Sequence, residues 1–204
     1  MNQIFTGIIF CCILYLCGSI PFSYIIPKKK KGIDIRDYGS GNIGATNVIR
    51  SLGKKIGIIC LVLDASKVFL PLIIIKYLIL KDMTLNEHQI LLSLAAIAGV
   101  LGHDYSIFMK FKGGKGVSSS MGVFFAINLI SGSIFLGLGI FLAFKTKIMS
   151  VTSFTVLTVS TVLIYFLTGS WIYFFLYLFL SLFSLFRHRK NLIRLIKGEE
   201  KKFM

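Results

Sequence analysis

Residues 56–80 read IGIICLVLDASKVFLPLIIIKYLIL, and this stretch decides the fold class. A helix rises 1.5 Å per residue, so about 20 apolar residues cross the roughly 30 Å hydrocarbon core of a bilayer. Several other windows of the chain are equally apolar, and its mean hydropathy is +0.82. We therefore predict an all-α integral membrane protein that forms a single membrane-embedded domain over residues 1–204.

Charge and cysteine content agree with this class. Of the 204 residues, 55% are hydrophobic and 15% are charged, yet the formal net charge is +15. In a soluble protein that charge would indicate nucleic acid, but here the basic residues fall in short loops, where they suit the cytoplasmic membrane face and anionic lipid or phosphate. We expect no nucleic-acid partner. The cysteines lie inside apolar spans, so we expect free thiols rather than disulfides or metal ligands.

We predict a bundle of seven transmembrane helices. Their approximate bounds are 4–26, 56–80, 88–108, 117–130, 132–144, 148–167 and 170–186. The fourth and fifth are short and separated only by Ser131, so one bent element is the alternative. Of the 23 Lys and Arg residues, 20 fall in segments that this topology places on one side. The preference of basic residues for the cytoplasm then predicts an outer N-terminus and a cytoplasmic C-terminus.

A glycine-rich loop, GSGNIGATN at 39–47, lies on that predicted cytoplasmic side. Glycine lets the backbone approach a ligand and aim several N–H groups at one anion. Thr46 or Asn47 could open a helix with its N-terminus toward the anion. Arg50 adds a planar fork that suits phosphate oxygens. The loop predicts a phosphate site, and a flexible interfacial loop is the alternative.

Two further polar segments fall on the same side. KFKGGKG at 110–116 combines lysine and glycine, but it lacks the spacing of a nucleotide-binding Walker A loop, and a snorkelling basic turn is the alternative. In the tail, His188 and Asn191 are three residues apart and share a helix face, within an amphipathic segment that suits the membrane surface. This His could carry a proton, although helix capping explains it equally well.

Ionisable residues also lie within the spans. Asp64 and Lys67 are spaced to form an ion pair, which is the favoured interpretation because intramembrane charge is costly. We expect His103 to support the lysine loop. The chain has no His-x4-Asp pair, no zinc-ligand spacing and no G-x-S-x-G elbow, so a covalent serine mechanism has no support. A transporter, which would need broken helices in matching halves, and a scaffold remain the alternatives.

Taken together, these motifs resemble the PlsY family of bacterial acyl-phosphate:glycerol-3-phosphate acyltransferases. The matching segments are 18–22, 34–36, 39–48 with Arg50, 63–64 with Lys67, 102–103, 110–117, 188–191 and 198–200. After His103 this family usually leads to a proline, whereas this chain has Asp104, Tyr105 and Ser106, a difference that changes how the lysine loop begins.

The resemblance implies a site on the cytoplasmic face. The catalytic residues assigned by it are Ser40, Asn42, His188 and Asn191. The residues assigned to substrate phosphate are Gly41, Thr46, Asn47, Arg50, Lys112, Gly114 and Lys115. Asp64, Lys67 and His103 are assigned to structural support.

The resemblance also implies the reaction. A fatty acyl group would pass from acyl phosphate to the 1-hydroxyl of sn-glycerol 3-phosphate, giving lysophosphatidic acid and phosphate, by direct attack without an acyl-enzyme. Substrate phosphate would help to remove the hydroxyl proton. No cofactor or metal is expected. The implied setting is the bacterial inner membrane, with functional coupling to the enzyme that makes acyl phosphate, and we expect a monomer.

Overall fold

The computed structural model describes residues 3–79, 83–200 and 202–203; the predicted end of the second span at Leu80 lies outside them. The described residues are helical, with connecting loops and no strand. The α-helices are α1 Gln3–Ser19, α2 Phe22–Lys31, α3 Ala45–Leu52, α4 Lys54–Ile74, α5 Leu85–Asp104, α6 Val117–Ile127, α7 Leu129–Thr146, α8 Met149–Thr168, α9 Trp171–Arg187 and α10 Arg189–Ile196. Short helices η1 and η3 cover Ile35–Asp37 and Ile107–Met109, and a π-helical turn η2 follows α4 at Ile75–Ile79.

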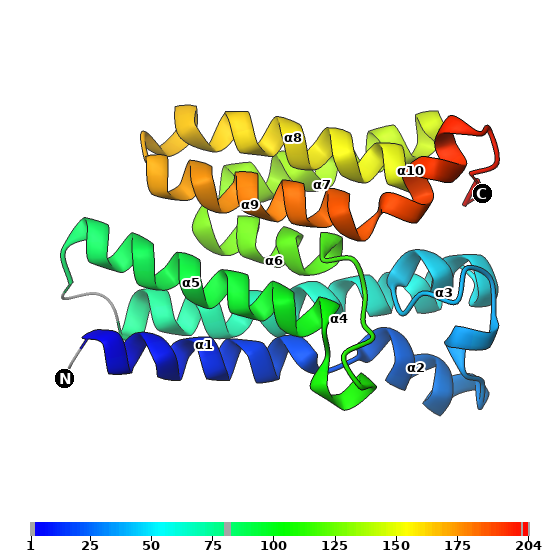
Figure 1. Ribbon diagram of the computed structural model, residues 1–204, viewed down its shortest axis with the longest axis horizontal. Helices are drawn as coiled ribbons and strands as arrows, with labels where there is room; N and C mark the ends of the chain where they lie inside the picture. Colours follow the sequence, from blue (N-terminus) through cyan, green and yellow to red (C-terminus); the bar gives the residue numbers. More distant parts are fainter. Residues whose placement is uncertain (1–2, 80–82, 201, 204) are drawn as a thin grey trace.

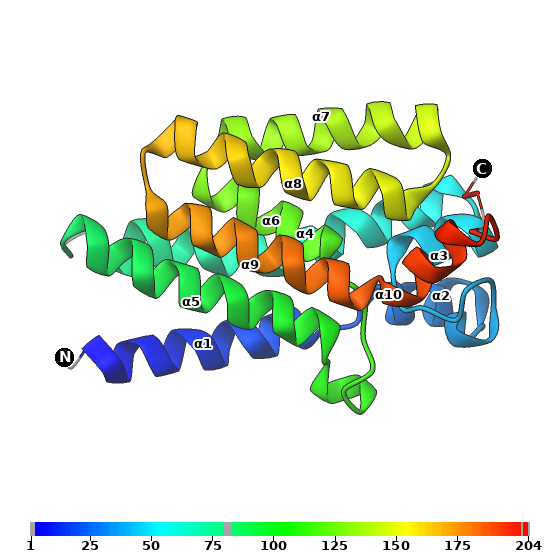
Figure 2. The same cartoon turned by 45° about the horizontal axis from the view of Figure 1, so that its top comes forward.

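The long helices α1, α4, α5, α7, α8 and α9 run side by side, with shorter α6 among them, and the two chain ends lie at opposite ends of the bundle (Figure 1). The view turned by 45° shows the same parallel arrangement, with α7 and α8 on one side of the bundle and α1 on the other (Figure 2). The short helices α2, α3 and α10 gather at the C-terminal end in both views. This end is where the predicted polar segments meet.

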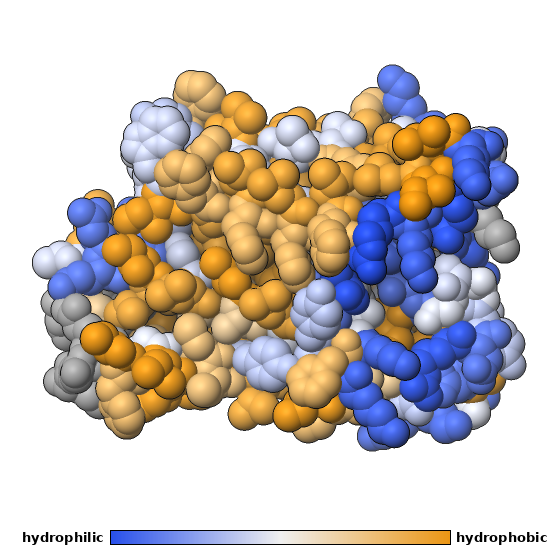
Figure 3. Space-filling model, viewed as in Figure 1, coloured by the Kyte–Doolittle hydropathy of each residue, from blue (hydrophilic) through white to orange (hydrophobic). Residues whose placement is uncertain are grey.

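The surface divides in the same way. Apolar residues cover the flanks of the long helices, while hydrophilic residues gather at the end formed by α2, α3 and α10 (Figure 3). A broad apolar flank beside a basic end is what a bilayer requires of a spanning bundle. The prediction of an all-α integral membrane protein is thereby confirmed.

Small residues bring α1 and α5 together. A Cβ added at Gly18 would lie 2.0 Å from the carbonyl oxygen of Gly99, and one added at Gly102 would lie 2.2 Å from that of Tyr15. Lipid tails are as apolar as leucine, so helices in a membrane gain from close backbone approach rather than from hydrophobic burial alone. These glycines set the distance between the two helices, and therefore where His103 at the end of α5 lies.

The structure resolves the question of the fourth and fifth spans. α6 ends at Ile127 and α7 begins at Leu129, and the side chain of Asn128 between them accepts a hydrogen bond from the Ser131 backbone N–H at 2.9 Å. They are two helices, and Ser131 lies inside the first turn of the second one. Lys76 holds the end of α6, because its Nζ donates to the carbonyls of Ala126 and Ile127 at 2.9 and 3.0 Å.

The number of membrane crossings stays a prediction. In the described residues, five helical segments are long and apolar enough to span a membrane, or six if α9 and α10 count as one bent span. α6 has 11 residues, which extend about 17 Å and cover roughly half of a hydrocarbon core. The fourth predicted span is therefore present as the helix α6, but it is too short to cross the hydrocarbon core by itself.

Candidate active site

A polar cavity of about 110 Å³ is lined by residues of α3 and α10, which lie at the same end of the bundle (Figure 1). Segments from almost the entire length of the chain contribute to its wall. The residues that line it are Ser40, Asn42, Gly44, Ala45, Thr46, Asn47, Arg50, Leu61, His103, Lys115, Val117, Ser118, Met149, Ser150, Ser153, His188, Asn191 and Glu200. The three predicted polar segments are thus brought together at one place.

Asn47 organises the glycine-rich loop from within. Its Oδ1 accepts a hydrogen bond from the Ser40 backbone N–H at 2.8 Å, and its Nδ2 donates to the carbonyls of Ile35 and Tyr38 at 3.1 and 2.9 Å. Gly39 has a φ of +61°, and a Cβ there would lie 2.2 Å from Asn47 Oδ1. The loop therefore needs glycine at this point. The Asn47 amide is used in holding Ser40, so its contact with substrate phosphate remains a prediction.

The cavity faces the start of α3. The helix begins at Ala45 with Gly44 as its N-cap, one residue before the earlier of the two predicted starts, and Gly44, Ala45 and Thr46 all line the cavity. The first N–H groups of a helix carry partial positive charge and bind anions well. Arg50, one turn further along, adds a full charge to the same wall, and burial lowers its pKa from the usual value.

The lysine loop rests against α5 through its glycines. Gly113 N–H donates to the carbonyl of Asp104 at 3.1 Å, and Gly114 N–H donates to that of His103 at 3.0 Å. A Cβ at Gly114 would lie 2.0 Å from His103 Nε2, so only glycine allows this packing. The loop then turns Lys115 into the cavity, where its Nζ donates to Asn191 Oδ1 at 2.6 Å.

The charge on Lys115 is sensitive to its surroundings. Burial lowers its pKa to about 8, Glu200 opposes this decrease, and the cations Arg194, Arg50 and Arg187 add to it. An amine with this pKa is mostly protonated at neutral pH and loses its charge within the mildly alkaline range. A bound dianion would favour the protonated form. Lys115 is therefore a cation that a phosphate would retain and that alkali would remove from the free site.

This pKa predicts an alkaline limit to substrate capture. For glycerol 3-phosphate, the substrate that the motif resemblance implies, kcat/KM reports ionisations of the free enzyme. It should decrease as the pH rises through about 8, because Lys115 is then deprotonated. A pH series of initial rates at low substrate checks this. Lys115→Arg stays charged at every pH in that series, so its profile should show no such decrease. An unchanged alkaline limb in Lys115→Arg would contradict the assignment to Lys115.

His188 lies at a bend between two helices, and Asn191 follows it in the second one. α9 ends at Arg187, α10 begins at Arg189, and the two axes differ by 63°. The sequence spacing predicted that the two residues share one face of a helix, but the chain bends at His188. Both residues nevertheless line the cavity. His188 is buried, and its Nδ1 lies 2.9 Å from the carbonyl oxygen of Ser184. That contact favours an N–H at Nδ1 and leaves Nε2 as an acceptor.

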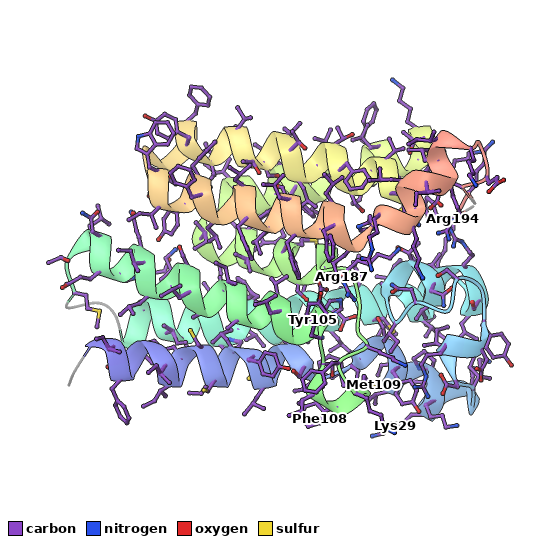
Figure 4. The ribbon with its side chains drawn as sticks, in the orientation of Figure 1. Lys29, Tyr105, Phe108, Met109, Arg187 and Arg194 are labelled. Atoms are coloured by element: carbon purple, nitrogen blue, oxygen red, sulfur yellow. The ribbon has the colours of Figure 1, made fainter. Side chains whose placement is uncertain are left out.

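Some residues in or beside the cavity had no role predicted from the sequence. They include Glu200, Arg194, Ser150 and Ser153. Glu200 Oε1 accepts from Asn191 Nδ2 at 2.6 Å and from Ser150 Oγ at 3.4 Å, and its Oε2 accepts from Arg194 Nε at 2.9 Å (Figure 4 shows Arg194 on α10). Burial alone would raise the pKa of Glu200, but these hydrogen bonds lower it. Glu200 could have been predicted as a site residue, because segment 198–200 matches the family. Ser150 and Ser153 lie within an apolar helix, and nothing in the sequence around them indicated a site.

The assigned support residues form a buried network behind the cavity. Lys67 Nζ lies 3.0 Å from Asp64 Oδ1 and 3.0 Å from His103 Nδ1, and it donates to the Ile20 carbonyl at 2.6 Å. Ser23 Oγ donates to Asp64 Oδ2 at 2.6 Å. The predicted Asp64–Lys67 ion pair is confirmed. It links the break between α1 and α2 to His103, which lines the cavity itself.

Three residues assigned to phosphate do not line the cavity. Gly41 and Lys112 are exposed outside it, and Gly114 is buried behind Lys115. Residues Asp104–Ser106, where the sequence departs from the family pattern, lead into the lysine loop. Ser106 Oγ donates to the carbonyl of Ser19, and the Ser106 carbonyl accepts from Phe111 N–H at 2.8 Å. A proline ring would supply no such hydroxyl.

An apolar groove of about 240 Å³ adjoins the polar cavity. It lies between α4, α6, α7 and α8, and its wall includes Ile58, Phe135 and Val156. The residues common to both walls are Leu61, Val117, Met149 and Ser153. A polar, cationic cavity and an apolar groove therefore lie side by side, with these four residues contributing to both walls.

Comparison with known proteins agrees with this geometry. A family model described as glycerol-3-phosphate acyltransferase matches residues 8–198. A glycerol-3-phosphate acyltransferase 2 of Thermotoga maritima is 47% identical over 188 residues, 92% of each chain. One from Aquifex aeolicus is 40% identical over 192 residues, 93% of this chain and 95% of the relative.

Two solved structures are also similar. Both are of PlsY, an integral membrane glycerol 3-phosphate acyltransferase, in its glycerol 3-phosphate and lysophosphatidic acid forms. The first superposes with a TM-score of 0.87 at 33% identity and covers 98% of this chain and 96% of the other. The second gives 0.85 at 32%, over 97% and 95%. The resemblance based on motifs is thus confirmed over nearly the entire chain, and this chain belongs to the glycerol-3-phosphate acyltransferase family.

Proposed function

We propose that this acyltransferase moves a fatty acyl group from acyl phosphate to the 1-hydroxyl of sn-glycerol 3-phosphate, giving lysophosphatidic acid and phosphate in the first acylation step of phospholipid synthesis. One observation carries the proposal: the basic cavity and the apolar groove share Leu61, Val117, Met149 and Ser153. A donor with a charged head and a long apolar tail fits that pair of spaces, and glycerol 3-phosphate needs only the polar one.

Both proposed substrates carry phosphate, so they repel each other. Lys115 and Arg50, which both line the cavity, would offset that repulsion together with the N-terminus of α3. Holding the hydroxyl and the carbonyl in reacting geometry would then supply much of the rate, as in other reactions made effectively intramolecular. The charge of the site thus suits two phosphates better than one neutral substrate and one anion.

The reaction needs little from the protein beyond positioning and charge. The glycerol 3-phosphate oxygen attacks the acyl carbonyl carbon, the bond from that carbon to the phosphate oxygen breaks, and the hydroxyl proton ends on the released phosphate. Ser40 and Asn42 line the cavity on the glycine-rich loop and would donate to the developing oxyanion. His188 and Asn191 also line the cavity and would orient the hydroxyl, with the Nε2 of His188 accepting a hydrogen bond from it.

The basic end of the bundle suits the cytoplasmic leaflet. Segments 28–55 and 187–202, which include most of the short helices' residues and the loops around them, carry 15 of the 23 lysines and arginines. The preference of basic residues for the cytoplasm would put the N-terminus outside and the C-terminus inside. A site at this face would receive water-soluble glycerol 3-phosphate from the cytoplasm and acyl phosphate along the membrane. We propose that it acts as a monomer in the cell membrane, functionally coupled to the enzyme that makes acyl phosphate.

The donor is tested by comparing substrates. Purified protein in detergent should release phosphate from a long-chain acyl phosphate only when glycerol 3-phosphate is present, and lysophosphatidic acid should form in equal amount. An acyl-CoA of the same chain length should give no ester, and glycerol should not replace glycerol 3-phosphate. Ester formation from acyl-CoA at a rate equal to that from acyl phosphate would contradict the proposed donor while leaving the family unchanged.

A further inference from the structure

The loop that carries Lys115 depends on its backbone for its position. It is rich in glycine, at Gly113, Gly114 and Gly116, and glycine brings no side chain to anchor a loop. The N–H groups of Gly113 and Gly114 bind the loop to the end of α5 through backbone hydrogen bonds. Lys115 Nζ donates to Asn191 Oδ1 of α10 at 2.6 Å, so the loop must also be positioned relative to α9 and α10.

Arg187, the last residue of α9, does this. Its Nη2 donates to the Gly114 carbonyl at 2.8 Å and to the Asp104 carbonyl at 3.1 Å, and its Nε donates to the Gly114 carbonyl at 3.2 Å. One planar guanidinium thus joins the residue before Lys115 to the end of α5. Ser184, one turn earlier on α9, adds a hydrogen bond to the Lys115 carbonyl at 3.2 Å.

The position of Arg187 is itself fixed by α5. Its Nε lies 3.8 Å from Oδ2 of Asp104, whose side chain is fully buried, and its guanidinium carbon lies 4.7 Å from the centre of the Tyr105 ring. Figure 4 shows Arg187 and Tyr105 close together between α9 and the end of α5. The buried Asp104 carboxyl lies beside the guanidinium, and a cation above an aromatic face gains attraction from it.

Arg187 does not line the polar cavity, whereas its neighbours Lys115 and His188 do. We propose that Arg187 is a positioning residue for acyl transfer: it holds the backbone before Lys115 and ends α9 just before His188, which sets these two side chains relative to each other. The inference rests on the proposed phosphate role of Lys115. A lysine in place of Arg187 would keep the charge but could not hold two carbonyl groups in a fixed plane.

The test compares Arg187→Gln, Arg187→Lys and the matched control Arg189→Gln. Arg189 lies two residues after Arg187. It is exposed, and its guanidinium donates to the carbonyl of Phe186. For Arg187→Gln we expect kcat/KM for glycerol 3-phosphate to decrease about 10-fold or more, which equals about 1.4 kcal/mol. Arg187→Lys should recover part of this, and Arg189→Gln should stay within about 2-fold of the wild type, as surface substitutions usually do.

Chemical rescue separates positioning from mere folding. Millimolar guanidinium ion should restore part of the activity of Arg187→Gln and none in Arg189→Gln, because only the first has an empty guanidinium site. Arg187→Gln with kinetics like those of Arg189→Gln would overturn the proposal. If Arg187→Gln fails to fold, Arg187→Lys decides: folded protein with wild-type kcat/KM would overturn it as well. All ratios use whichever acyl donor the wild type accepts, so a wrong donor does not affect this test.

Discussion

Lys115→Met should lower kcat/KM for glycerol 3-phosphate by about 100-fold or more, the size of the loss when one preorganised group facing developing charge is removed. The Lys115 amine points into the polar cavity and is held by Asn191 at 2.6 Å. Methionine has a similar length without the charge, so the cavity keeps its shape while the repulsion between two phosphates is no longer offset. Initial rates of phosphate release at varied glycerol 3-phosphate measure the effect.

Lys112 provides the matched control. It is in the same loop, three residues earlier, but it is exposed and outside the cavity. Lys112→Met removes the same charge from the protein, and we expect a change of no more than about 3-fold, from weakened long-range attraction of anions. Equal losses from the two substitutions would contradict a specific role for Lys115. They would instead favour a general effect of positive charge at this end of the bundle.

The second large effect is on stability. Asp64→Asn should destabilise the folded protein by about 3–5 kcal/mol, because it leaves the buried Lys67 ammonium without its counter-charge. The two side chains are 1% and 2% exposed, and their charged atoms are 3.0 Å apart. For a chain of this size we expect the melting temperature in detergent to decrease by roughly 6–20 °C.

The partner substitution and the double variant complete this test. Lys67→Met should be destabilised similarly, since Asp64 then lacks its cation. Asp64→Leu combined with Lys67→Met removes both charges, and apolar pairs often replace buried ion pairs with little loss. The double variant should therefore unfold at a higher temperature than either single one. If the double variant were as unstable as the sum of the two, packing rather than the ion pair would account for the loss.

Much of the fold was predictable because it depends on local properties. Length and apolarity of a segment are enough to recognise a spanning helix, and the i,i+3 spacing of Asp64 and Lys67 is enough to predict their ion pair. Composition alone predicted that the glycine- and lysine-rich loops form a polar site, and the structure brings residues of both loops to one cavity. The short length of α6 was less predictable, since the apolar run continues across Asn128 into α7.

The positions of individual side chains were less predictable than the motifs. Sequence reasoning treated Asn47 and Lys112 as equivalent to Lys115, since all three belong to polar loops. In the structure the Asn47 amide is hydrogen-bonded within its own loop, and Lys112 is exposed. Which way a side chain points from a loop depends on the backbone turn, and glycine-rich turns are the hardest to deduce from residue types.

The amino-acid sequence by itself determined that this protein is a helical membrane bundle with basic, glycine-rich loops, because helix formation and partition into lipid depend on residues close together in the chain. Only the tertiary structure decided which residues share the cavity. Lys115 meets Asn191 across 76 positions, and Arg187 reaches Gly114 across 73. Such distances are set by how α1, α5 and α9 pack, and that packing depends on close backbone approach at glycines such as Gly18 and Gly102.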